Sequence, residues 1–227
     1  MDSTHLGIFG ASGSGKTTLV KQMLKGRDRV ICLDVKNEIN KEKGWEAHFW
    51  NGSQNFGRFL RARADRKFKI AIAMPLGGAV PWAEIANEVA YWVMLMQEDV
   101  NEGRSERRVT LYFDEASKSL PVNIEPRKLP YVADLPERGR SYGVELVIVS
   151  QRPTGVNKDV RGNLARLVSF RLVEHDDQRE MEKKLGPDGK GLIAGLKNFE
   201  FIECDMTTGE KRKGKVLKTK PPTYTVA

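Results

Sequence analysis

The sequence predicts an α/β fold in which a mostly parallel central sheet has helices on both faces, with a possible C-terminal hairpin. Short apolar segments typical of buried strands alternate with segments of helical spacing, and such alternation favours parallel strands joined by helices. A glycine-rich loop follows the first of these strands, and polar residues follow several others. Because ligand-binding loops gather at the carboxyl ends of parallel strands, these segments also indicate where a site lies.

The first half of the chain alternates between strand and helix patterns. Apolar runs predict strands over 6–9, 29–35, 45–50 and 69–74. Helices are expected over 18–25, over 56–64 and over 81–100. Pro81 is suited to the first position of the last helix, since its fixed φ matches helical backbone and its missing N–H costs nothing there.

The second half continues the alternation and ends differently. Strands are predicted over 109–113, over 144–149 and within 164–172, with helices over 134–142 and 176–185. Segments 199–204 and 215–217 can pair as a hairpin around Thr208-Gly209, whereas 123–130 is proline-rich and irregular. No repeat or linker is evident, so we expect one domain over 1–205. A basic hairpin or tail over 206–227 follows it and is not a separate domain.

The glycine-rich loop fits the pattern G-x-x-x-x-G-K-[ST] between a predicted strand and a predicted helix. In that context its backbone N–H groups and the helix N-terminus cradle phosphates. Lys16 would reach the β- and γ-phosphates, and the Thr17 hydroxyl would hold Mg²⁺. The pattern therefore predicts a P-loop that binds ATP and Mg²⁺, in preference to a glycine-rich turn with an incidental lysine. The predicted binding residues are Gly10, Ala11, Ser12, Gly13, Ser14, Gly15, Lys16, Thr17 and Thr18.

Two acidic residues and an amide complete a predicted hydrolytic site. Asp114 directly follows the apolar strand 109–113 and would hold Mg²⁺ opposite Thr17. Backbone alternation points the adjacent Glu115 away from Asp114, where it would polarise an attacking water. Gln151 ends the next strong strand, and its amide can donate to the γ-phosphate or accept from that water. Paired acids are common on protein surfaces, but after an apolar strand in a chain that also has a P-loop they favour a catalytic role.

Composition and charge exclude several classes of protein. No run approaches eighteen uncharged apolar residues, and residues 1–5 do not resemble a secretory signal, so we expect no transmembrane segment. Cys32 and Cys204 lack metal-site spacing and lie in apolar strands, as buried thiols would. The net charge is +8, and residues 206–227 hold six basic residues and one acidic residue. Further basic clusters at 58–69 and 104–108 suit either a polyanionic partner or a solvated surface.

Three sequence blocks resemble the FtsK–HerA superfamily of DNA-pumping ATPases. Residues 138–153 place an arginine and a glycine before an apolar strand closed by Ser-Gln-Arg-Pro, and 163–170 resembles that family's Asn-Ile-x-x-Arg-Ile-x-Phe run. Residues 34–38 are similar to its Asp-Pro-Lys-Gly-Glu, but Val35 and Asn37 replace the proline and the glycine. With the P-loop and Asp114-Glu115, the resemblance covers most of 6–172 in the family's order. It implies a P-loop NTPase fold of the RecA-like, ASCE type.

The resemblance also implies a homo-oligomeric ring, usually a hexamer, that moves double-stranded DNA by ATP hydrolysis. In such rings an arginine of a neighbouring subunit stabilises charge on the γ-phosphate. Arg140 is the first candidate for this role and Arg166 the second, followed by Arg152 and Arg138. For each arginine the alternative is a surface ion pair or a contact with a DNA phosphate.

Among these ATPases, a short single-domain chain most resembles the genome-packaging ATPases of membrane-containing, double-jelly-roll viruses such as tectiviruses. That resemblance implies packaging of a viral genome into a preformed capsid, with vertex or membrane packaging proteins as partners. The protein would then be found in the virion, at the packaging vertex, and in the host cytoplasm. Three alternatives stay open: a conjugative or chromosomal DNA translocase, a small-molecule kinase, and an assembly ATPase like those of filamentous phages.

Overall fold

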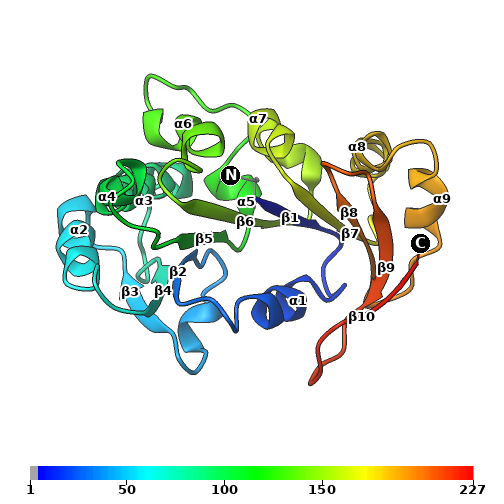
Figure 1. The fold of residues 1–227 in the computed structure, drawn as a ribbon, viewed down its shortest axis with the longest axis horizontal. Helices are drawn as coiled ribbons and strands as arrows, with labels where there is room; N and C mark the ends of the chain where they lie inside the picture. Colours follow the sequence, from blue (N-terminus) through cyan, green and yellow to red (C-terminus); the bar gives the residue numbers. More distant parts are fainter. Residues whose placement is uncertain (1–4, 227) are drawn as a thin grey trace.

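The computed structural model describes residues 5–226, and a ten-stranded sheet runs through them in the order β10-β9-β8-β7-β1-β6-β5-β2-β4-β3 (Figure 1). The strands are β1 (Leu6–Phe9), β2 (Arg29–Leu33), β3 (Glu46–Phe49), β4 (Phe68–Ala73), β5 (Val109–Phe113), β6 (Val144–Ser150), β7 (Arg166–Phe170), β8 (Glu200–Asp205), β9 (Lys211–Lys215) and β10 (Thr223–Val226).

The sheet is mostly parallel, as the sequence predicts. The strands from β7 to β3 in the sheet order pair in parallel, whereas β8, β9 and β10 are each antiparallel to their neighbour. The expected hairpin therefore exists as β8 and β9, and β10 extends it by one strand. The second hairpin strand begins at Lys211, before the predicted segment 215–217.

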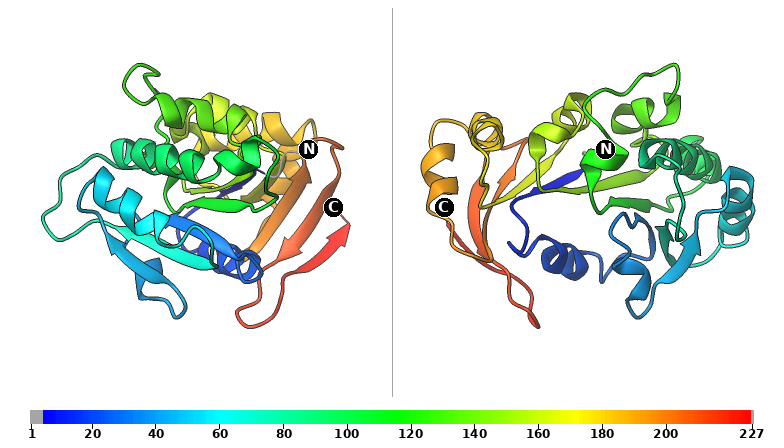
Figure 2. Two further views of the ribbon diagram at one scale, coloured as in Figure 1. Left: turned by 60° about the vertical axis from the view of Figure 1, so that its left-hand side comes forward. Right: turned by 180° about the vertical axis from the view of Figure 1, so that it is seen from behind.

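Helices cover the two faces of the sheet unequally (Figures 1 and 2). Leu19 and Val20 of α1, with Ile39 of the 3₁₀ helix η1, pack on one face. Most other helices pack on the opposite face. The helices are α1 (Lys16–Met23), η1 (Ile39–Lys41), α2 (Ser53–Arg61), α3 (Trp82–Met96), α4 (Glu98–Asn101), α5 (Ala116–Ser119), α6 (Pro130–Arg138), η2 (Pro153–Gly155), α7 (Lys158–Gly162), α8 (His175–Leu185) and α9 (Gly189–Ala194).

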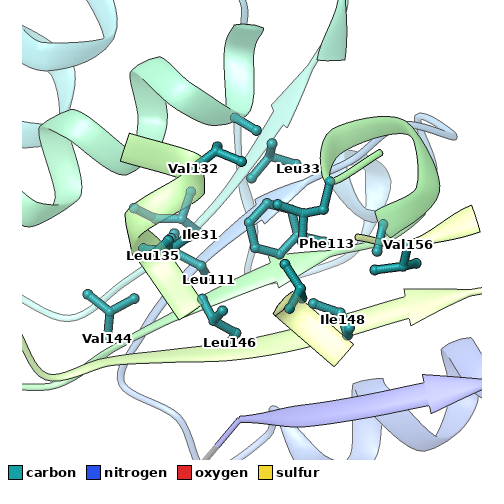
Figure 3. Packing of buried hydrophobic residues seen from close by; sticks show 14 of the residues in the cluster. Ile31, Leu33, Leu111, Phe113, Val132, Leu135, Val144, Leu146, Ile148 and Val156 are labelled. Carbon is teal, nitrogen blue, oxygen red and sulfur yellow. The ribbon is translucent and has the colours of Figure 1, made fainter. Parts of the chain in front are cut away.

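The central strands bury apolar side chains on both faces, which is why their sequences are almost continuously apolar. In β2, Ile31 and Leu33 join the core under α3 and α6, whereas Val30 and Cys32 join the core under α1. Figure 3 shows the larger core, where side chains of β2, β5 and β6 meet those of α6. This packing holds the carboxyl ends of the strands, and so the predicted site, in fixed positions.

Long-range contacts explain the bounds of two helices that differ from the prediction. The helix expected over 134–142 is α6, which begins at Pro130, since Asn87 Oδ1 of α3 accepts from the N–H groups of Tyr131 and Val132 at 3.0 and 3.3 Å. The helix expected over 81–100 is divided at Gln97 into α3, which ends at Met96, and α4, which continues to Asn101. At this division the side-chain Nε2 of Gln97 donates to the carbonyls of Arg107 and Tyr142, at 2.7 and 3.0 Å.

The cysteines are buried, as the sequence predicts. Cys32 and Cys204 are free, buried thiols. No helix in that range is both long and apolar enough to cross a bilayer.

Gly214 tests whether β9 packs into the sheet as described. It pairs with Phe201, and a Cβ at Gly214 would lie 2.2 Å from Cζ of the Phe201 ring. We therefore expect Gly214→Ala to lower the free energy of unfolding by about 1–3 kcal/mol through overpacking, measured by urea denaturation. Gly162→Ala is the control, since a Cβ there meets nothing within 4 Å. It should be neutral or stabilise by about 0.4–1 kcal/mol, and equal effects of the two substitutions would contradict the packing.

Candidate active site

The glycine-rich loop leaves β1 between two neighbouring strands and is tied to both. Gly10 N donates to the carbonyl of Ser150 at the end of β6, at 3.3 Å, and Ala11 N donates to the carbonyl of Arg171 after β7, at 2.9 Å. A Cβ on Gly10 would lie 2.5 Å from Cβ of Phe170, so only glycine fits at this position. Gly15 has a φ of 109° and precedes the first residue of α1. The loop therefore opens directly into a helix N-terminus, as a phosphate cradle requires.

Lys16 is a buried cation at the centre of this loop. Its side chain is folded back, and Nζ donates to the carbonyls of Gly10 and Ala11, both at 2.7 Å. Burial, and secondly the Lys36 ammonium, lower the pKa of Lys16 to about 8, while Glu115 and Asp114 partly oppose this shift. The ammonium is thus held at the cradle by weak acceptors that a phosphate group would replace with stronger ones.

Asp114 has the surroundings of a magnesium ligand. It is fully buried at the end of β5, and Oδ1 accepts from the Tyr112 hydroxyl at 2.8 Å. Oδ2 is buried without a hydrogen bond from any residue between 5 and 226. Burial raises the pKa of Asp114, opposed by Lys36 and by the Tyr112 hydroxyl. An oxygen ligand with unused capacity fits the predicted Mg²⁺ site with the Thr17 hydroxyl, where phosphate oxygens and waters would complete the shell.

Glu115 is positioned by serines that the sequence does not single out. Its Oε1 accepts from the hydroxyls of Ser117 and Ser150, both at 2.9 Å. The Ser150 hydroxyl in turn accepts from the Arg152 N–H at 3.1 Å. The Glu115 carboxylate, which follows β5, is therefore fixed to Ser150 at the end of β6. The next residue, Gln151, is exposed. A serine at the end of an apolar strand does not by itself indicate a functional residue. The contact between Ser150 and Glu115 becomes evident only from the pairing of β5 with β6.

The loop after β2 carries a second cation into the site. Lys36 Nζ lies 3.7 Å from Asp114 Oδ2 and 3.8 Å from Glu115 Oε2. The buried Asp34 carboxylate holds the loop by accepting from the N–H groups of Glu38 and Asn40. Asn37, with a φ of 54°, adopts left-handed backbone where the similar family pattern has glycine. Asparagine is one of the few residues that tolerate this conformation, so the departure in sequence leaves a loop that still presents Lys36.

A cavity of about 270 Å³ joins these elements. It is lined by Ser12, Gly13, Gly15, Lys16, Thr17, Thr18, Lys36, Glu38, Gln151 and Phe199. The structure thus brings the predicted P-loop residues and Gln151 to one place. A larger cavity, of about 750 Å³, lies against β8–β10. Both of its arginines are already paired, since Glu203 binds Arg166 and Arg212. The smaller cavity is therefore the one with the chemistry of a phosphate site.

Stretches of the chain are similar in sequence to archaeal helicases. A probable DNA double-strand break repair helicase HerA of Methanocaldococcus jannaschii is 30% identical over 96 residues, which is 42% of this chain and 19% of that protein. A DNA double-strand break repair helicase HerA of Sulfurisphaera tokodaii is 21% identical over 136 residues, 57% of this chain and 28% of that protein. The matches thus span between 19% and 28% of these relatives' lengths. No protein-family model matches the chain.

The fold matches a viral protein over nearly all of both chains. The genome-packaging NTPase B204 of Sulfolobus turreted icosahedral virus 2, solved with ATPγS, has a TM-score of 0.72 at 15% identity, covering 94% of this chain and 98% of that one. The predicted resemblance to the FtsK–HerA ATPases is confirmed. VirB4 of Thermoanaerobacter pseudethanolicus has a TM-score of 0.63 at 14% identity, covering 95% and 90%. At such identities these structures establish the fold alone.

The two preferred arginines lie at the sheet edge opposite the P-loop. Arg140 precedes β6, and its Nη2 donates to Oδ1 and the carbonyl of Asn163 at 3.3 and 3.4 Å. Burial, and secondly Arg140, lower the pKa of the nearby His5 to about 4. Arg166 begins β7 and pairs with the buried Glu203. Neither arginine faces the P-loop of its own chain, and a role for either in a neighbour's site stays a prediction.

The other two arginines differ from each other in position. Arg152 lies at the P-loop edge of the sheet, with a side chain 66% exposed and Nε 3.7 Å from Asp177 Oδ2. Arg138 ends α6 and pairs with Asp134 of the same helix.

Part of the basic charge is neutralised within the fold. Lys213 pairs with Glu200 in the neighbouring strand, and Arg104 and Arg107 pair with Asp99 and Asp65. Formal charge therefore overstates the positive surface of the predicted basic clusters.

Lys16 gives a test of the site's electrostatics that needs no ligand. Its pKa of about 8 lies below the usual 10.5, so the folded chain loses this proton before the unfolded chain does. Stability from this group therefore rises with pH between about 8 and 10. We expect Lys16→Met to be more stable than the wild type at pH 7, by about 1–3 kcal/mol, in thermal unfolding without nucleotide.

The gain in Lys16→Met should shrink as the pH approaches 10. Lys25→Met, a change just beyond the same helix at an exposed lysine, should show neither effect. A destabilised Lys16→Met protein at pH 7 would contradict the account.

Proposed function

We propose that this protein is an ATPase that couples Mg²⁺-dependent ATP hydrolysis to the movement of double-stranded DNA. The observation that carries the hydrolytic part is the grouping of the P-loop, Lys16, Asp114, Glu115 and Gln151 at one edge of the sheet. ATPγS binding by B204, which shares this fold, supports ATP as the ligand.

Each residue has a role that its surroundings suit. The P-loop N–H groups and Lys16 bind the phosphates, with the ammonium exchanging its two carbonyl partners for phosphate oxygens. When bound with Thr17 and Asp114, Mg²⁺ supplies charge neutralisation on the β- and γ-phosphates. Glu115, held by two serine hydroxyls, orients a water and accepts its proton. Gln151 is exposed at the cavity and binds that water or the γ-phosphate.

Similarity to DNA-handling proteins supports DNA as the partner. HerA is a double-strand break repair helicase, and the matched stretches reach 30% identity. The conjugation coupling protein TcpA of pCW3 shares the fold, with a TM-score of 0.51 at 14% identity, over 57% of that chain. Conjugative DNA transfer is therefore the main alternative within DNA movement.

We further propose that the DNA is a viral genome packaged into a preformed capsid. The fold match to the packaging NTPase B204 supports this choice, because it extends over nearly all of both chains. As the resemblance to the FtsK–HerA ATPases implies, the protein would act as a homo-oligomeric ring of six subunits, docked on vertex or membrane packaging proteins. Its places of action would be the virion and the host cytoplasm.

Turnover with and without DNA tests the proposed function. We expect the wild type to hydrolyse ATP faster with long linear double-stranded DNA. Glu115→Gln, which keeps the hydrogen-bonding shape but removes the base, should lose at least about a hundredfold in kcat while still binding ATPγS. Glu106→Gln, at an exposed acid before β5, is the matched control. Turnover indifferent to DNA in the wild type would reject the DNA-coupled part and favour a small-molecule enzyme.

Subunit mixing tests the arginine supplied in trans. Arg140→Ala keeps its phosphate site but lacks the arginine, and Glu115→Gln keeps Arg140 but lacks the base. Each protein alone should therefore be nearly inactive. Mixing them should restore turnover at sites where a Glu115→Gln subunit presents Arg140 to an Arg140→Ala neighbour. The same mixture with Arg166→Ala or Arg152→Ala ranks the other candidates. Full turnover by Arg140→Ala alone would exclude Arg140 from this role.

A further inference from the structure

Phe199 has an unusual backbone conformation beside the P-loop. It immediately precedes β8, and because β8 is antiparallel to β7, this end of the strand lies at the P-loop edge of the sheet. Its φ is +67°, a left-handed value that bulky side chains rarely adopt. Val216 N donates to the Phe199 carbonyl at 2.8 Å and fixes this geometry. Such strain is concentrated at ligand and active sites, where the surroundings enforce it.

The Phe199 ring is exposed at the cavity and is not part of the core. The residue is 39% exposed, although the neighbouring Phe170 and Phe201 are fully buried. Cδ1 of the ring lies 3.0 Å from where a Cβ on Gly15 would stand, so the ring contacts the P-loop just before α1. It lines the same cavity as Lys16 and Thr18. An aromatic face is thus presented to solvent at the edge of a phosphate cradle.

The order of the strands determines which part of a nucleotide meets this ring. From β1, the sheet continues through β6, β5 and β2 in one direction, and the segments that follow these strands carry Gln151, Asp114 and Lys36. In the other direction it continues through β7 to β8, and Phe199 immediately precedes β8. The reacting γ-phosphate must lie toward the acids, so the nucleoside leaves the cradle toward β7 and β8.

We propose that the Phe199 ring is the stacking platform for the base of the bound nucleoside triphosphate. This inference rests on the proposed function, since it assigns the base end of the same site. Stacking uses the π-face that every base has, so it adds affinity without selecting strongly among bases. A purine, with the larger face, gains most.

Comparing phosphate ligands with and without a base separates stacking of the base from binding by the cradle. The variants are Phe199→Leu, which removes the ring, Phe199→Trp, which retains an aromatic face, and Phe49→Leu, at an exposed phenylalanine on the distant edge strand β3. Calorimetry would measure the Kd of ATPγS, of GTPγS and of inorganic tripolyphosphate, each with Mg²⁺. We expect Phe199→Leu to weaken both nucleotides about tenfold and to leave tripolyphosphate unchanged. Phe199→Trp and Phe49→Leu should resemble the wild type.

The outcomes distinguish this inference from the proposed function. If the wild type binds neither ATPγS nor tripolyphosphate, the proposed function fails and this inference fails with it. If the wild type binds both, and Phe199→Leu weakens them equally or not at all, only the stacking role fails. Phe199→Gly guards against a folding defect, because glycine adopts the left-handed backbone without strain. It should unfold at or above the wild-type temperature and still show the selective loss for nucleotides.

Discussion

The position of β1 between β6 and β7 is the constraint on which the site depends. The first two N–H groups of the P-loop donate to carbonyls at the ends of these two neighbours, so the loop's shape is set by the sheet. The close approach of Phe170 requires glycine at position 10 for the same reason. Residues from β5, β6 and the loop after β2 then meet on one side of the cradle, and Phe199 lies on the other.

Opposite charges lie close together at this edge of the sheet, where two lysines and two acids are grouped. Lys36 lies within 4 Å of Asp114 and Glu115. The same two acids raise the pKa of Lys16, whereas burial and Lys36 lower it. Burying such charges costs stability unless they are paired, and the pairing at 3.7–3.8 Å is loose. The site is therefore electrostatically strained in itself, as expected where binding of an anion and a cation relieves the strain.

The local features of the site could be predicted from the sequence, whereas its long-range contacts could not. The P-loop and Asp114-Glu115 are visible because each lies within a few residues of a strongly apolar strand. The contact of Lys36 with both acids depends on β2 pairing with β5, and the cap of α6 depends on Asn87 in another helix. Nothing in the sequence around Phe199 indicates a binding role. Only its left-handed backbone and its exposed ring, both seen in the structure, indicate one. Similarly, nothing local shows that Arg166 has a buried partner in β8.

Release of a third strand from a DNA triplex tests the central claim, movement along double-stranded DNA, most directly. A labelled oligonucleotide bound at one end of a linear duplex would be displaced by a motor that arrives from the other end. The account predicts release that requires ATP hydrolysis, fails with ATPγS, and lags longer as the duplex is lengthened. ATP hydrolysis without release, or release at the same rate with and without ATP, would contradict it.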